Sequence, residues 1–511
     1  MVNDGTKGIG KIIFSSSLGT LIEWYDFYIF GMLAKTISTQ FFPEGNDTAA
    51  LLSTLAIFAA GFLVRPFGAL FFGRLGDLIG RKYTFLLTLV LMGGSTFLIG
   101  LVPAYKSIGI AAPLLVLLLR LIQGLALGGE YGGAATYVAE HAPAHRRGYF
   151  TAWIQTTATL GLFVALGIIM AVKSNMNDAA FTAEWGGWRY PFWISILLVG
   201  VSVYIRLKMK ESPVFAKLKV ENKTSVNPLK ESFGHKSNFK MVLLALFGAV
   251  MGQGVIWYTG QFYAQSFLEN TVKIEFMQNR EILLWAIGLA TPFFLFFGWL
   301  SDKVGRKWIM LTGMLLGVIF YRPIFGKLLK DGDAKEWMKE KFEFVKEEKK
   351  ISLYKGDSIL QISSQYKVSG GSKFTRVVTD TLIKGRDDLQ HIIQSEKNAV
   401  INNKILSSSL KWKFIFLIWI MIIFVTMVYG PIAAFLVELF PAKIRYTSMS
   451  LPYHIGNGVF GGLVPFIATL LSTTFTSDPL VGLWYPIGVA ALCFVIGALY
   501  LNNKTDKNID D

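Results

Sequence analysis

The sequence predicts an all-α membrane protein with twelve transmembrane helices in two six-helix pseudo-repeats. It also predicts a small α+β extracytoplasmic insertion between helices 9 and 10. Hydrophobic residues make up 53% of the 511 residues and charged residues only 16%, whereas soluble domains carry about a quarter charged residues. The apolar residues form continuous runs of about 20, the length of helix that crosses a bilayer. A loop motif also recurs at the same place in both halves of the chain.

Helices rather than strands are expected, because a membrane strand needs only about ten residues of alternating character. We expect spans at residues 13–35, 50–72, 83–103, 110–138, 150–172, 190–208, 241–266, 282–300, 308–326, 412–438, 451–473 and 481–502. They define an N-terminal bundle at 1–206, a cytoplasmic linker at 207–240, and a C-terminal bundle at 241–326 and 411–503.

Basic loops orient these spans, because short cytoplasmic loops are rich in Lys and Arg. Alternate loops carry Arg74, Arg81 and Lys82; Arg146 and Arg147; Lys303, Arg306 and Lys307; Lys443 and Arg445. We therefore expect both termini in the cytoplasm and a multi-pass protein of the cytoplasmic (inner) membrane. The net charge of +16 is explained by the basic residues of these loops, which would contact the anionic lipids of the bilayer. Nucleic acid is not expected, since no basic stripe carries interleaved aromatics.

The insertion at 327–410 follows the ninth span and should therefore face outward, since long domains cross the membrane whatever their charge. The run 334–350 has helical spacing with Trp337, Phe342 and Val345. The stretch 351–382 alternates as strands do around Gly370-Gly371. We expect a small α+β module here, with a disordered loop as the alternative.

Metal and cofactor chemistry is not expected. The sequence holds one cysteine and five histidines, and their spacing matches no metal site. No phosphate-binding fingerprint occurs, which argues against an ATP-driven pump. The insertion contains no nucleophile and base at a useful spacing, so we expect no enzyme and no cofactor.

The recurring loop is Gly-Arg-Leu-Gly-Asp-Leu-Ile-Gly-Arg-Lys at 73–82 and Gly-Trp-Leu-Ser-Asp-Lys-Val-Gly-Arg-Lys at 298–307. Repeats of this kind build transporters from two halves around a central site. The aspartate of each copy can bind a loop arginine or the N-terminus of a neighbouring helix. We expect a gating role for Asp77, Arg81, Asp302 and Arg306, with a plain cytoplasmic turn as the alternative.

These loops resemble the signature of the major facilitator superfamily. The segments 22–28, 64–68, 128–133 and 187–192 resemble the metabolite:proton symporter family, which includes shikimate, citrate, 2-oxoglutarate and proline/betaine carriers. Residues 211–215, 438–441 and 445–447 also resemble its motifs. The resemblance covers nearly all of the chain except 327–410, so it indicates a branch with an extracytoplasmic insertion. It is specific for the family and does not identify the substrate.

The resemblance implies a secondary active transporter that works as a monomer by alternating access. We expect proton-coupled symport of a small organic acid or zwitterionic metabolite, with the small-molecule substrate and protons as partners. One alternative is an efflux carrier that works by proton antiport. The other is a transporter-like receptor that uses the extracytoplasmic module.

Ionisable residues inside spans are the candidates for the chemistry, because charges at mid-membrane are costly and usually functional. Glu23 and Asp26 share one face of helix 1, and Arg120 of helix 4 could pair with them or grip a substrate carboxylate. A structural ion pair is the alternative for all three. Gating roles are also expected for Arg65 and Glu130, with structural pairing and packing as their alternatives.

Polar and aromatic residues of three other spans could form the rest of the site. The candidates for the substrate and the proton are Gln155, Trp257, Tyr258, Gln261, His454 and Asn457. For Trp257 and Tyr258 the alternative is an interfacial anchor. For His454 the alternative is a hydrogen-bonded packing residue, although histidine could also titrate here.

Overall fold

A computed structural model describes residues 9–79, 81–128, 131–208, 228–339, 341–354, 357–382, 400–441 and 445–503. They form two compact units. The helical unit consists of Met1–Tyr263, Ile287–Tyr321 and Ile420–Asp511, and the insertion unit consists of Ala264–Ala286 and Arg322–Trp419. Most of the linker expected at 207–240 lies outside the described residues.

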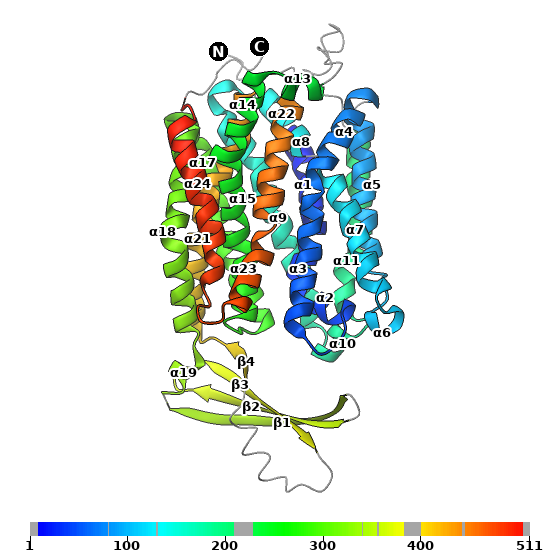
Figure 1. The fold of residues 1–511 in the computed structure, drawn as a ribbon, viewed down its shortest axis with the longest axis vertical. Coiled ribbons are helices and arrows are strands. Elements are labelled where there is room, and N and C mark those ends of the chain that lie inside the picture. Colours follow the sequence, from blue (N-terminus) through cyan, green and yellow to red (C-terminus); the bar gives the residue numbers. More distant parts are fainter. Residues whose placement is uncertain are drawn as a thin grey trace. The chain divides into compact units, whose positions relative to one another are not determined.

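The described residues of the N-terminal half, 9–79, 81–128 and 131–208, form helices joined by turns and loops (Figure 1). Its helices are α1 (Ile9–Met32), α2 (Ala34–Phe41), α3 (Asp47–Leu63), α4 (Arg65–Ile79), α5 (Arg81–Ile99), α6 (Tyr105–Ile108), α7 (Ala111–Gly128), α8 (Tyr131–His141), η1 (Ala144–Arg146), α9 (Arg147–Ser174), α10 (Asp178–Thr182), η2 (Gly187–Arg189) and α11 (Tyr190–Lys208).

The C-terminal half, from residue 228, contains helices before and after a sheet in the order of the chain. Its helices are α13 (Pro228–Gly234), α14 (Lys236–Ala245), η3 (Leu246–Val250), α15 (Met251–Tyr258), η4 (Thr259–Tyr263), α16 (Ala264–Asn270), α17 (Phe276–Val304), α18 (Arg306–Asp331), α19 (Ala334–Trp337), α21 (Ser408–Leu439), α22 (Arg445–His454), η5 (Ile455–Gly461), α23 (Val464–Thr474), η6 (Val481–Leu483) and α24 (Trp484–Tyr500).

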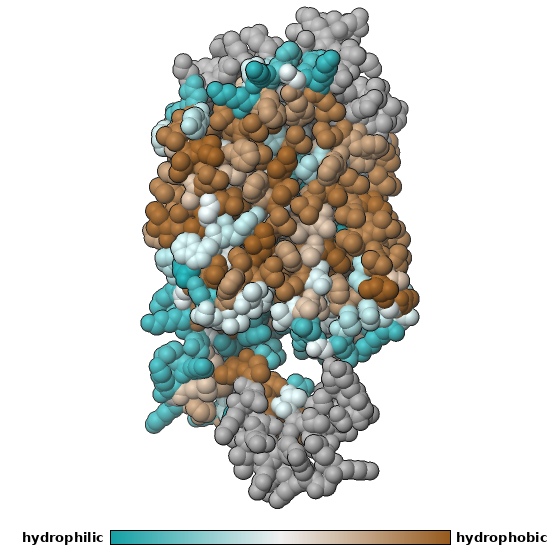
Figure 2. Space-filling model, in the orientation of Figure 1, coloured by the Kyte–Doolittle hydropathy of each residue, from teal (hydrophilic) through white to brown (hydrophobic). Residues whose placement is uncertain are grey.

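Nine helical segments of the described chain are long and apolar enough to cross a membrane. They are Asp47–Phe72, Ala111–Gly128, Ala144–Ser174, Lys236–Asn270, Phe276–Val304, Arg306–Asp331, Ser408–Leu439, Thr447–Thr474 and Val481–Tyr500. The other expected spans, 13–35, 83–103 and 190–208, fall on α1, α5 and α11. Hydrophobic residues cover most of the helix sides on the face seen in Figure 2, as expected for helices that face lipid.

Close helix crossings bring the middle of α15 against η5. A Cβ on Gly254 would lie 2.4 Å from the Gly456 carbonyl oxygen, and one on Gly461 would lie 2.9 Å from the Gly254 carbonyl oxygen. Only glycine permits such backbone contact. A Cβ on Gly458 would likewise lie 2.9 Å from the carbonyl oxygen of Phe62 in the N-terminal half. The contacts of Gly254 hold α15 against η5 within the C-terminal half, and the contact of Gly458 with Phe62 brings η5 close to the N-terminal half.

Arg189 fastens the start of α11 to the end of α5. Its Nη1 donates to the carbonyls of Gly100 at 2.8 Å and Val102 at 2.7 Å. The guanidinium also stacks on Trp185 and Trp188, 4.5 and 4.4 Å from the ring centroids. Its side chain thus satisfies backbone carbonyls at a helix end that have no intrahelical partner.

Replacing Arg189 with lysine should destabilise the protein by about 3 kcal/mol, because two charged hydrogen bonds and the stacking are lost. Thermal unfolding of the purified protein in detergent would measure this. Lys106→Ala is the matched control, since it removes an exposed ion pair with Glu44 at 2.7 Å that should be worth less than about 1 kcal/mol. Equal unfolding temperatures for both variants would contradict the prediction.

The insertion unit contains a four-stranded antiparallel sheet in the order β1-β2-β3-β4. The strands are β1 (Phe342–Tyr354), β2 (Asp357–Val368), β3 (Lys373–Leu382) and β4 (Val400–Ile405) (Figure 1). The expected strands around Gly370-Gly371 are confirmed, and Gly371 has the positive φ of 87° that its turn requires.

The helix expected at 334–350 is wrong for most of its length. Helix α19 ends at Trp337, and Phe342 begins the thirteen-residue strand β1. Cross-strand pairing overrides the helical tendency of this Glu- and Lys-rich segment. Phe342 and Phe344 both contact the Tyr366 ring, with centroids 5.6 and 6.0 Å apart, which is the period of two expected for a strand.

Lys404 of β4 is buried at the base of the sheet, where its Nζ donates to the Gly332 carbonyl at 2.7 Å. Burial, with some effect from nearby Lys273, lowers the pKa of Lys404 to about 8, although Asp333 opposes the shift. Between pH 8 and the ordinary lysine pKa, the unfolded chain therefore binds more protons than the folded chain. The contribution of Lys404 to the free energy of unfolding therefore rises with pH in that window.

We therefore expect the stability difference between wild type and Lys404→Met to change with pH, in favour of the wild type, between about pH 8 and 10. Thermal unfolding of both proteins across that range would measure the difference and cancel the titration of other groups. A constant difference would contradict the buried, neutralisable state of Lys404.

Candidate functional site

Arg65 lies at the centre of an aromatic cluster in the helical unit. It opens α4 directly after the break at Val64 and is 3% exposed. Its guanidinium carbon lies 4.1 Å from the ring centroid of Phe62, 4.6 Å from Phe27 and 6.0 Å from Trp24. Arginine stacks on aromatic faces in this way when removed from water.

Four tyrosines interact electrostatically with this guanidinium: Tyr28, Tyr258, Tyr429 and Tyr453. Nevertheless, Nε and Nη2 of Arg65 make no hydrogen bond to any described residue, and neither does the Tyr258 hydroxyl. Tyr258 therefore lies beside Arg65 but outside hydrogen-bond geometry. A buried donor left in this state costs about 1–3 kcal/mol, so the arrangement calls for a functional explanation.

The C-terminal half supplies further aromatic side chains of this cluster. The Trp257 ring lies 4.5 Å from Tyr429 and 6.2 Å from Trp24, measured between centroids. The Tyr429 hydroxyl is 2.7 Å from that of Tyr453, so one of them donates to the other. Because Trp24 belongs to α1 and Trp257 to α15, the cluster joins the two halves of the chain.

Arg120 of α7 lies on the same phenylalanine as Arg65, with its guanidinium carbon 4.7 Å from the Phe27 centroid. It donates to the Gln123 side chain and, at 3.5 Å, to the Phe58 carbonyl. Gln123 in turn donates to Thr96 Oγ1 at 2.8 Å. Arg120 is therefore more firmly held by the protein than Arg65.

The predicted carboxylates lie on α1. Asp26 is fully buried, and its main-chain carbonyl accepts from Gln123 Nε2 at 3.3 Å. That contact connects it to the network around Arg120. Glu23 also belongs to α1, but its side chain lies outside the described part of the structure.

The predicted polar residues of other helices are buried as well: Gln155 of α9, Gln261 of η4, His454 of α22 and Asn457 of η5. Asn457 Nδ2 donates to Gln253 Oε1 at 2.8 Å. The Gln261 amide and the His454 ring nitrogens make no hydrogen bond of normal geometry within the described residues. They add to the unsatisfied polar groups of this region.

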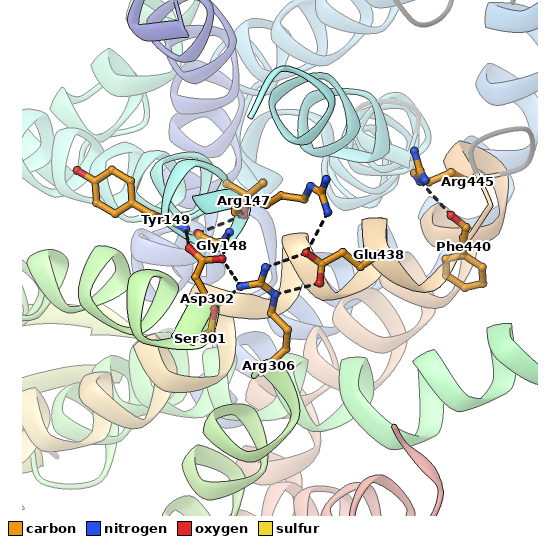
Figure 3. Close-up of polar contacts among 10 residues, drawn as sticks. Arg147, Gly148, Tyr149, Ser301, Asp302, Arg306, Glu438, Phe440 and Arg445 are labelled. Carbon is orange, nitrogen blue, oxygen red and sulfur yellow. Dashed lines mark hydrogen bonds and ion pairs between the residues drawn. The ribbon is translucent and has the colours of Figure 1, made fainter. Parts of the chain in front are cut away.

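A second cluster joins the two halves near the loop motifs (Figure 3). It consists of Arg147, Asp302, Arg306 and Glu438, and we call it the ion-pair latch. Asp302 Oδ1 accepts from the Gly148 amide at 2.8 Å, and Oδ2 accepts from the Tyr149 amide at 2.9 Å. Its carboxylate therefore caps the N-terminus of α9, where a negative charge is stabilised. Arg306 also donates to Asp302, at 2.7 Å.

Glu438 extends the latch. It accepts from Arg306 Nη2 at 2.8 Å and from Arg147 Nη1 at 3.2 Å (Figure 3). Arg147 belongs to the N-terminal half and Glu438 to the C-terminal half, and both side chains are almost fully buried. In the reciprocal direction, Arg445 Nη1 lies 3.7 Å from Glu140 Oε1 of the N-terminal half.

Sequence reasoning missed these pairs, although a signal for them exists. Glu-x-x-Pro-Ala-x-x-Arg occurs at 140–147 and again at 438–445, a second internal repeat with both offsets equal to 298 (438 − 140 and 445 − 147). The arginine of each copy pairs with the glutamate of the other. Asp77 and Arg81 occupy α4 and α5, but their side chains lie outside the described residues, as does all of Glu130.

The fold and these two clusters define a multi-pass membrane protein whose halves meet at a polar, aromatic centre. Comparisons place it among transporters. The family model "Sugar (and other) transporter" matches residues 12–236. The inner membrane metabolite transport protein YhjE of Escherichia coli (strain K12) is 31% identical over 500 residues, covering 97% of this chain and 94% of that protein.

The alpha-ketoglutarate permease of the same organism is 30% identical over 502 residues, covering 98% of this chain and 95% of the permease. Its proline/betaine transporter is 32% identical over 338 residues, but the chain spans only 65% of that protein's length. A partially occluded, inward-open structure of the E. coli xylose transporter XylE matches with a TM-score of 0.64 at 15% identity, over 98% of this chain and all of XylE.

The chain therefore belongs to the major facilitator superfamily, in the family that these metabolite transporters represent. It is a multi-pass membrane transporter and not an enzyme. The resemblance inferred from the loop motifs is confirmed.

Proposed function

We propose that this protein takes up a small organic acid or zwitterionic metabolite by proton-coupled symport across the cytoplasmic membrane. The observation that carries the proposal is Arg65, a buried guanidinium at the meeting of the two halves with two nitrogens that bind no described residue. A substrate carboxylate would satisfy those nitrogens with charge-assisted hydrogen bonds. Two of the relatives are named for substrates that carry carboxylates, the proline/betaine transporter and the alpha-ketoglutarate permease.

Substrate contacts on the far side would come from Trp257, Tyr258 and Gln261, together with Asn457 and His454. The hydroxyl and amide groups among them can bind a second polar group of the substrate. Arg120 would support the site through Gln123, and Gln155 would contribute from α9. Because the site draws on both halves, a substrate bound there would favour their closure around it.

Proton coupling would reside on the carboxylates Glu23 and Asp26, with His454 as a further titratable group. A carboxyl group buried among apolar side chains takes up a proton more readily than one in water. Protonation near Arg65 and Arg120 would change the local charge and hence the affinity for an anionic substrate. A structure matched by the fold, though at low identity, is described as a proton:xylose symporter.

Alternating access would use the ion-pair latch as a gate, which would close one end of the transport path while its ion pairs are formed. Asp302 and Arg306 would act from the second copy of the loop repeat and Asp77 and Arg81 from the first, with a gating role for Glu130 as well. Breaking and reforming these contacts would let the halves rock about the central site. Function as a monomer is part of this proposal.

The membrane topology we propose has twelve spans, six in each half, with both termini in the cytoplasm. It adds α1, α5 and α11 to the nine apolar segments. The sheet between α18 and α21 would then be extracytoplasmic, since it follows the ninth span. Cysteine labelling tests this assignment. Single cysteines would replace Lys339 and Arg146, which are exposed, and a membrane-impermeant reagent would be added from either side of the membrane.

Uptake into proteoliposomes would test the function. Purified protein would be reconstituted and supplied with labelled organic acids, betaines and amino acids under an imposed inward proton gradient. We expect accumulation of at least one carboxylate, and loss of accumulation when an ionophore collapses the gradient. Accumulation that is unchanged by the ionophore would contradict symport while leaving carboxylate transport intact.

A further inference from the structure

Two π segments, in which main-chain hydrogen bonds span five residues instead of four, carry candidate residues of the site. They are η4, which contains Gln261, and η5, which contains Asn457. Such segments are rare and occur frequently at functional sites. A side chain that donates to a helix carbonyl from outside competes with the helix's own amides and helps to change their hydrogen-bond pattern.

The first such donor is Tyr321 of α18. Its fully buried hydroxyl donates to the Ile256 carbonyl at 3.0 Å, one turn before η4. The hydrogen bonding is already irregular there, because the Thr259 amide is shared between the carbonyls of Val255 and Ile256. The two helices are also in close contact at this point, since a Cβ on Gly317 of α18 would lie 2.4 Å from Ile256 Cδ1.

The second donor is Tyr485 of α24. Its hydroxyl donates to the Phe460 carbonyl of η5 at 2.8 Å. In the π pattern the amide for this carbonyl would come from residue 465, but Pro465 has no amide hydrogen. Tyr485 therefore supplies a donor where the π pattern cannot continue.

The candidate site depends on the placement of both segments. Asn457 of η5 donates to Gln253 of α15, and a Cβ on Gly461 would lie 2.6 Å from Cδ2 of the Tyr258 ring. Gln261 belongs to η4 itself. A shift of either segment would therefore move the side chains that we expect to contact the substrate.

We propose that Tyr321 and Tyr485 are positioning residues, whose hydroxyls hold the two π segments and with them the candidate site residues of the C-terminal half. Each tyrosine acts through a main-chain carbonyl. The effect on transport rests on the proposed function, because it requires these residues to bind the substrate. The effect on the π segments themselves does not.

Removing each hydroxyl alone tests the proposal. Amide hydrogen exchange of the full-length protein in detergent, measured without substrate, reports on the segments themselves. We expect exchange about five times faster at residues 259–263 in Tyr321→Phe and at residues 455–461 in Tyr485→Phe, the ratio that corresponds to a typical hydrogen bond. Wild-type exchange in both variants would overturn the proposal, whatever the protein transports.

The KM of uptake separates positioning from a general loss of stability. Labelled alpha-ketoglutarate and labelled proline serve as probes in proteoliposomes. For a probe that the wild type takes up, we expect the KM to rise about five-fold in Tyr321→Phe and in Tyr485→Phe while kcat stays within about two-fold. Trp193→Phe is the matched control, because Trp193 Nε1 donates to the Gly100 carbonyl at 3.0 Å, at a helix end outside the site.

A wild-type KM in both tyrosine variants would overturn the positioning role, and so would an equal rise in Trp193→Phe. If the wild type takes up neither probe, that result bears on the proposed function alone, and the exchange measurement decides the proposal. If Tyr321→Phe does not fold, Tyr485→Phe tests the same claim at the other segment.

Discussion

Replacing Arg65 with glutamine should reduce the kcat/KM of carboxylate uptake roughly 10²- to 10³-fold, the usual loss when one partner of a buried charge pair is truncated. The physical reason is the geometry of the site. The guanidinium is buried against Phe27 and Phe62. Its Nε and Nη2 make no hydrogen bond to any described residue, and these are the nitrogens that would bind the proposed substrate carboxylate. Initial uptake rates into proteoliposomes, measured over a range of substrate concentrations, provide the value.

Stability separates this role from a structural one. The loss of activity in Arg65→Gln should come without a fall in unfolding temperature, because the variant removes donors that the protein itself leaves unsatisfied. Arg65→Lys should recover part of the activity, since it keeps the charge but not the fork of donors. Arg146→Gln, at an exposed position, is the neutral control. Uptake by Arg65→Gln at the wild-type rate would exclude Arg65 from the site.

Replacing Glu438 with glutamine should open the latch. Arg147 and Arg306 both depend on this carboxylate, and their side chains are 2% and 4% exposed. Removing one partner of a buried ion pair typically costs about 3–5 kcal/mol. We therefore expect the closed arrangement to lose roughly that much relative to one in which the arginines reach water. That change would shift the conformational equilibrium by about two to four powers of ten.

Distances between spin labels would measure the shift. Cysteines at Arg146 and Lys303 place labels at exposed positions on opposite halves beside the latch, and the native Cys493 is buried. The parent protein should give mainly one short distance, and Glu438→Gln should add a longer population. Glu140→Gln is the matched control. Its pair with Arg445 is longer, at 3.7 Å, so its effect should be smaller. An unchanged distance distribution in Glu438→Gln would contradict the gate.

The helices could be predicted from the sequence because hydrophobicity and length decide them almost alone in a bilayer. Helices lie at all the expected spans. Nine segments of the described chain are also long and apolar enough to cross a membrane. Strand β1 could not be predicted, because its run of Glu and Lys has helical tendency and becomes a strand only by pairing with β2.

The candidate site was predicted only in part, for a related reason. Internal charges such as Asp26 and Arg120 are conspicuous in an apolar span. For Arg65 the sequence predicts a gating role, with a structural pair as the alternative, and only the structure shows its guanidinium stacked on Phe27 and Phe62. Partners far apart in the chain, such as Arg147 and Glu438, follow from the packing of helices, although their repeated motif offered a clue.

The central claim is that a carboxylate metabolite crosses the membrane while bound at Arg65 between the two halves. Counterflow measures this without an imposed proton gradient: vesicles preloaded with an unlabelled carboxylate are diluted into buffer that contains its labelled form. We predict transient accumulation of label with wild-type protein and none with Arg65→Gln. Two results would contradict the central claim. One is that, for every carboxylate in the panel, wild-type vesicles contain no more label than protein-free vesicles. The other is that Arg65→Gln shows the same counterflow as the wild type.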